Sequence, residues 1–63
     1  MNNFKGLSLE PTDALKNIST ILEGGYLLVI CSDKAVSEIG DLVIDFARQY
    51  AAAACTYSLE NQK

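Results

Sequence analysis

Residues 24–31 read GGYLLVIC, a pair of glycines followed by a continuous apolar run. The pair supplies the left-handed backbone conformation that commonly ends a helix. An uninterrupted apolar run with β-branched and aromatic members is typical of a strand that is buried on both faces. The sequence therefore predicts that a helix ends at Gly24–Gly25 and that residues 26–31 form the central strand of a sheet.

The segment before this run has the pattern of an amphipathic helix. Pro11 suits a first helical turn, where a missing amide hydrogen costs little, and Ser8 is a candidate cap. We expect a helix over residues 10–23, preceded by a short strand over residues 3–8. The apolar residues of the predicted helix recur at spacings of three and four: Ala14, Leu15, Ile18, Ile21 and Leu22.

A second helical pattern follows the apolar run, and Ser32 and Asp33 are candidate caps for it. Gly40 either lies within one helix or separates a turn at residues 34–39 from a helix over residues 40–51, because glycine is a poor helix former. The tail changes character near Ala52 or Ala53, and we expect a final strand up to Leu59. The apolar positions of the second helix are Val36, Ile39, Leu42, Val43, Phe46, Ala47 and Tyr50.

These elements predict one α/β domain over residues 1–63 with the order β-α-β-α-β. Each helix has one apolar stripe, so both helices would cover one face of a small sheet in a two-layer α+β sandwich. The opposite sheet face would then be bare and apolar. We therefore expect the protein to associate with itself or with a protein partner, most simply as a homo-oligomer.

Composition excludes several classes of function. The net charge is −3 and the five basic residues are scattered, so we expect no nucleic-acid binding, which needs a cationic track. The apolar runs are too short to cross a membrane. The chain has no histidine and two well-separated cysteines, which predicts neither a metal nor another cofactor. The same two cysteines fit a reducing, cytoplasmic setting better than a secreted disulfide framework.

A longer pattern over about residues 4–50 resembles the TusA/SirA-like family of small sulfur-carrier proteins. The pattern comprises Gly6-Leu7 with Pro11, the turn Glu23-Gly24-Gly25, the apolar run at 27–30, and the series Ser32-Asp33, Ala35-Val36, Ile39-Gly40-Asp41 and Phe46-Ala47. In that family a glycine-containing strand leads through a Cys-Pro-x-Pro turn into a helix. The resemblance implies an α/β fold and a role in sulfur transfer or a related regulatory pathway.

The family motif is incomplete at its reactive position. Leu9, Glu10 and Pro11 occupy the motif turn, so the persulfide-carrying cysteine is replaced near Leu9. Leucine cannot carry sulfur. The resemblance therefore implies a non-enzymatic module that acts through protein–protein contacts and has no catalytic residue at this turn.

Two alternative functions stay open. Cys31 ends the predicted strand next to the start of the second helix, where it could serve as a displaced thiol or persulfide acceptor, although a buried structural cysteine is the more ordinary interpretation. Cys55 has the pattern of a core residue. The second alternative is a small-ligand binding domain whose pocket forms between subunits.

Overall fold

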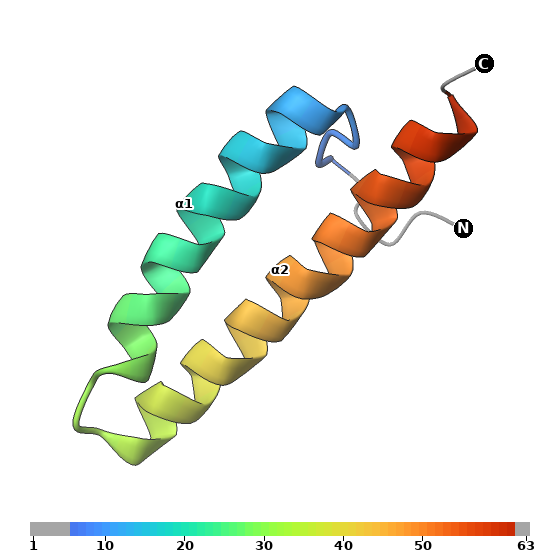
Figure 1. Ribbon diagram of the computed structural model, residues 1–63. Helices are drawn as coiled ribbons and strands as arrows, with labels where there is room; N and C mark the ends of the chain where they lie inside the picture. The colour runs from blue at the N-terminus through green and yellow to red at the C-terminus, as the bar shows by residue number, and fades with distance from the viewer. Residues whose placement is uncertain (1–5, 62–63) are drawn as a thin grey trace.

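The computed structural model describes residues 6–61, which form two helices. Helix α1 spans Pro11–Val29 and helix α2 spans Lys34–Glu60. The helices lie side by side and run in opposite directions, as Figure 1 shows. The molecule is a rod with dimensions of 47 × 21 × 17 Å.

The predicted α/β sandwich is wrong, because residues 6–61 contain no strand and no sheet. The expected central strand at 26–31 is the last turn of α1 followed by the connecting loop. The expected final strand up to Leu59 is part of α2. Residues 6–8 are not a strand either, and residues 3–5 of that predicted element lie outside the described part of the chain.

One alternating spacing of three and four residues explains the pairing of the two helices. Side chains at such positions form a single seam along a helix, as they do in coiled coils. Glycine and alanine occupy much of this seam, and the pattern continues through Gly25 into the apolar run. The seam positions are 14, 18, 21, 25 and 28 in α1, and 36, 40, 43, 47, 50, 54 and 57 in α2, all of them buried or half-buried.

The glycines in the seam allow the helix backbones to approach closely. A Cβ atom placed on Gly40 would lie 2.7 Å from the backbone nitrogen of Val29. One placed on Gly25 would lie 3.0 Å from a side-chain carbon of Ile44. The sequence predicted that Gly24 and Gly25 end a helix, but α1 continues through both to Val29, and Gly40 does not interrupt α2. A glycine inside a helix costs about 1 kcal/mol relative to alanine. Contact between α1 and α2 stabilises both helices in spite of this cost.

The loop between the helices is fixed by hydrogen bonds at both of its ends. Asp33 is the N-cap of α2, as predicted, and its Oδ1 accepts hydrogen bonds from the backbone amides of Ala35 and Val36 at 2.9 and 3.3 Å. The hydroxyl of Ser37 donates to the carbonyl oxygen of Val29 at 3.1 Å. This bond satisfies an acceptor at the end of α1 and joins the two helices.

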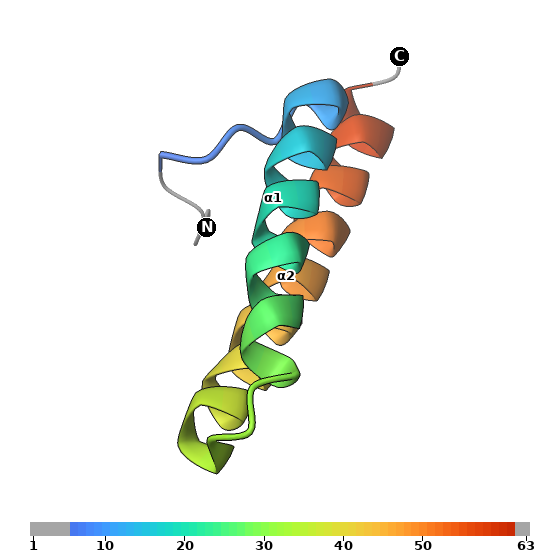
Figure 2. The ribbon, with the colours of Figure 1, turned by 90° about the vertical axis from the view of Figure 1, so that its left-hand side faces the viewer.

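The segment before α1 is attached to the hairpin through Tyr50, the largest fully buried side chain. The Tyr50 hydroxyl donates to the carbonyl oxygen of Ser8 and accepts from the side-chain amide of Asn17 at 3.1 Å. Leu7 and Leu9 pack against the same cluster of buried residues. Figure 2 shows residues 6–10 leaving the N-terminal end of α1 to one side.

Candidate functional site

Many large apolar side chains of the hairpin face solvent. In residues 6–61 the buried hydrophobic residues are Ala14, Ala47, Tyr50 and Ala54, so three of the four are alanines. A pair of helices buries one stripe of each helix and leaves the flanks uncovered. The exposed large hydrophobic residues are Leu15, Leu22, Tyr26, Leu27, Ile30, Ile39, Leu42, Phe46 and Leu59.

Four of these residues, together with smaller or half-buried neighbours that line the same hollows, form what we call the hydrophobic face. Its α1 members recur at spacings of three, four and seven, so they share one flank of the helix beside the seam. The α2 members lie on the flank of α2 that borders the same hollow. The hydrophobic face consists of Pro11, Leu15, Ile18, Leu22 and Tyr26 from α1 and of Ala51, Cys55 and Leu59 from α2.

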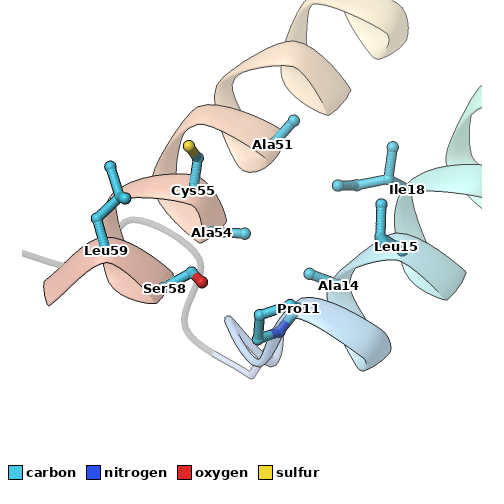
Figure 3. A pocket seen from close by; sticks show the side chains of 9 residues that line it. All are labelled: Pro11, Ala14, Leu15, Ile18, Ala51, Ala54, Cys55, Ser58 and Leu59. Carbon is cyan, nitrogen blue, oxygen red and sulfur yellow. The ribbon is translucent and has the colours of Figure 1, made fainter. Parts of the chain in front are cut away.

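Two shallow hollows lie in the hydrophobic face. The first, of about 270 Å³, lies between the helices, and Leu15 and Ile18 border it opposite Cys55. The second, of about 480 Å³, lies along α1, where Leu22 and Tyr26 border it. Leu15 and Ile18 line both hollows. Figure 3 shows Ala14 and Ala54 pointing toward each other across the first hollow.

The hydrophobic face is almost free of charge. Among the described residues that line the two hollows, Glu23 is the only charged one, although the whole chain carries a net charge of −3. The other polar groups of the lining include the hydroxyls of Ser19, Ser58 and Tyr26. Such a surface offers apolar contact area and shape to a partner but little electrostatic guidance.

A smaller apolar patch lies on the opposite flank of α2. At 100° per residue, Ile39, Leu42 and Phe46 project away from the flank that carries Cys55 and Leu59. Phe46 is 39% exposed and its ring lies 6.4 Å from the ring of Tyr50, measured between centroids. This patch is shorter than the hydrophobic face.

The turn that the sequence singled out has a structural role. Pro11 lies in the first turn of α1, as predicted, and is its first residue, while Glu10 is the N-cap residue without a side-chain capping bond. Leu9 packs against the core cluster. The backbone amide of Glu10 donates to the hydroxyl of predicted cap residue Ser8 at 3.1 Å.

Glu10 also joins the turn to the end of α2. Its Oε2 accepts a hydrogen bond of 3.0 Å from the hydroxyl of Tyr57. This hydrogen bond and the negative charge of Glu10 raise the pKa of Tyr57 above its usual value, because ionising the phenol would remove the donor and place two negative charges together.

The two cysteines lie at different places, and neither is a core residue as the sequence suggested. Cys31 is exposed in the loop, and Cys55 is exposed on the hydrophobic face. The amide of Cys31 donates to the carbonyl oxygen of Leu28 at 3.2 Å. The structure therefore does not bring the two thiols together, although Cys55 and Pro11 of the motif turn line the same hollow.

The described part of the chain holds neither a candidate metal site nor a membrane-spanning helix. No group of three or more cysteine, aspartate and glutamate residues within residues 6–61 is placed to hold a metal ion. Neither helix described here is both long and apolar enough to cross a membrane.

Sequence reasoning missed the hydrophobic face as a surface. Leu15 and Leu22 were assigned to the buried stripe of a helix, and Tyr26 to a strand. The signal that separates seam from surface is the row of small residues Gly40, Ala47 and Ala54, which recur every seven residues and mark the true contact line.

Comparison with family models, with curated proteins and with solved structures gave no match for this chain. Nothing in these comparisons identifies the TusA/SirA-like family. The strand–turn–helix fold that the resemblance implied is contradicted by the helical hairpin.

Proposed function

We propose that the protein acts without enzymatic chemistry, as a helical association module whose hydrophobic face docks on the apolar face of another helical protein surface. The observation that carries this proposal is the continuous run of exposed leucine and tyrosine side chains on one flank. Leu15, Tyr26 and Leu59 are each more than 60% exposed. Contiguous apolar surface bordered by polar residues marks interaction sites in soluble proteins.

The arrangement of polar groups supports binding over catalysis. Several titratable side chains make structural contacts: Asp33 caps α2, Glu10 binds Tyr57, and Asp45 pairs with Arg48 at 3.6 Å on the surface. A nucleophilic thiol is activated by a neighbouring base or by a lowered pKa. Cys31 is exposed in the loop, and its role as a thiol acceptor stays a prediction.

We also propose a reducing, cytoplasmic setting. Cys31 and Cys55 are both free and both exposed. Exposed thiols persist in compartments where glutathione and thioredoxin keep cysteine reduced, and they oxidise elsewhere.

The two cysteines provide an internal test of the docking proposal. Dilute purified protein is added to cell extract and alkylated briefly, and the labelling rates of Cys55 and Cys31 are compared with those in buffer. We expect extract to slow the labelling of Cys55 several-fold and to leave Cys31 unchanged, because only Cys55 lies on the hydrophobic face.

A double variant, Leu15→Gln with Leu59→Gln, should restore rapid labelling of Cys55 in extract. Equal labelling rates for Cys55 in extract and in buffer, together with a labelling rate in buffer that does not fall as the protein concentration is raised, would refute the proposed function. Glutamine is suitable because it is a good helix former and introduces no charge.

A further inference from the structure

The hairpin has too little interior to be a complete helical domain. Its radius of gyration is 13.2 Å, against roughly 11 Å for a compact chain of this length. Its accessible surface is 4767 Å², and a compact monomer of 6.8 kDa would expose about 4,000 Å². The excess is comparable to the roughly 800 Å² that each partner contributes to a standard protein–protein interface.

The hydrophobic face supplies most of what such an interface needs. Leu15, Leu22, Tyr26 and Leu59 are 66%, 40%, 61% and 64% exposed. Taking roughly 200 Å² for a large apolar residue, these four residues alone present about 500 Å² to solvent. Smaller members of the face, such as Pro11 and Ala51, lie between them and add to this area.

Charge and shape favour a second copy of the same chain over a charged partner. The face offers no set of carboxylates to a basic protein, and its lack of charge prevents repulsion between two acidic chains at the centre of contact. The hydrophobic face carries exposed leucines, and it also carries the hollows beside them. A surface with projections and hollows can pair with itself about a two-fold axis.

We propose that two copies of the chain associate through their hydrophobic faces to form a four-helix bundle. Each hairpin supplies two helices, and the leucines of one copy fill the hollows that Leu15 and Ile18 border in the other. Four helices enclose a shared apolar core, whereas two helices leave the apolar flank of each helix exposed to solvent. This inference rests on the proposed function and names its partner.

The chain contains a matched pair of double variants that tests the proposal. Leu15→Gln with Leu59→Gln changes the hydrophobic face. Leu27→Gln with Leu42→Gln changes other surfaces of the same two helices, at leucines that are 65% and 70% exposed. Both variants have the same composition and charge. Circular dichroism shows whether each one stays helical, and sedimentation equilibrium of the full 63-residue chain gives its mass as a function of concentration.

We expect wild-type protein and the Leu27/Leu42 variant to sediment at twice 6.8 kDa and the Leu15/Leu59 variant to require at least tenfold higher concentration to dimerise. A helical wild-type monomer at every concentration would overturn the dimer. Loss of dimer in the Leu27/Leu42 variant alone, or equally in both variants, would also overturn it. If wild-type protein is monomeric while Cys55 is still protected in extract, the proposed function survives with a different partner.

Discussion

At the scale of single residues, Gly24 and Gly40 show how differently two helical glycines can be used. Both lie inside a helix. Nothing lies within 4 Å of a Cβ atom placed on Gly24, whereas one placed on Gly40 meets the backbone and side chain of Val29 and the side chain of Leu28. The first glycine therefore carries only the entropic cost of its flexibility, while the second is required by the contact.

Substituting each glycine by alanine should change stability in opposite directions. Gly24→Ala should raise the free energy of unfolding by about 0.5–1 kcal/mol, since alanine is the better helix former and meets no obstacle. Gly40→Ala should lower it by about 2 kcal/mol, because the 2.7 Å approach to the Val29 nitrogen forces the helices apart. Urea denaturation of the two variants measures both values. A stabilised Gly40→Ala protein would mean that the helices are not in this close contact.

Tyr57 provides a test by titration. Its pKa is raised first by the hydrogen bond to Glu10 and then by the charge of Glu10. Glu10→Gln should therefore lower the pKa of Tyr57 toward its ordinary value of about 10. Tyrosinate absorbance measures this shift, with Tyr57→Phe as the control that removes the signal of this residue.

The sign of the effect on stability follows from the direction of the shift. A phenol with a raised pKa in the folded state stabilises the protein while it is protonated. That contribution is complete below the unfolded pKa of about 10 and is lost as pH rises through the folded pKa. Wild-type protein should therefore lose stability in alkali more steeply than Tyr57→Phe, and parallel curves would argue against the Glu10 contact.

At the scale of elements, Tyr50 joins three parts of the chain. It lies on α2, accepts a hydrogen bond from Asn17 on α1 and donates one to Ser8 in the segment before α1. Buried polar groups that lose a partner cost more than the net value of the bond, because they have already given up water. The Tyr50 hydroxyl therefore holds the segment before α1 against the hairpin.

Tyr50→Phe should lower the free energy of unfolding by about 1–2 kcal/mol. Because the ring remains, the two helices should stay paired. The loss should appear locally, as faster amide hydrogen exchange in residues 6–10. Tyr26→Phe, at a tyrosine that is 61% exposed, is the matched control and should leave that exchange unchanged. Uniformly faster exchange throughout the Tyr50→Phe protein would indicate global loosening instead.

Local signals in the sequence predicted some element boundaries correctly. Pro11 and Asp33 act through their own backbone neighbours, so the start of α1 and the cap of α2 could be predicted. Gly25 could not be interpreted in this way, since the reason for a glycine there is Ile44, nineteen positions later in the chain. A helix that ends at these glycines leaves the apolar run after them to form a strand, which is why the sequence predicts one there.

The candidate site was predictable only in its general character. The sequence predicted an uncovered apolar surface, but on a sheet, and residues 6–61 form no sheet. Leu15 and Leu59 occupy surface positions because alanine and glycine fill the seam between the helices. Hydrophobicity alone cannot distinguish a leucine that packs within the chain from one that packs against another chain.

At the scale of the whole molecule, a dimer would make stability depend on concentration. Association stabilises the folded chain by mass action. A hundredfold increase in protein concentration should raise the melting temperature of wild-type protein on the order of 5 °C. The Leu15→Gln, Leu59→Gln variant should melt at a lower temperature than wild-type protein at every concentration at which the wild type is dimeric. A wild-type melting temperature independent of concentration would contradict association.

The short loop of the hairpin has a consequence for the rate of folding. Four residues connect α1 to α2, so the contacts near the loop join parts of the chain that are close in sequence, and such contacts form rapidly. The bonds from Tyr50 to Ser8 and from Tyr57 to Glu10 instead span 42 and 47 residues. Closing such long loops costs more entropy. We therefore expect pairing of α1 with α2 to begin at the loop and to spread away from it. The attachment of residues 6–10 should be the last step in folding and the first step in unfolding.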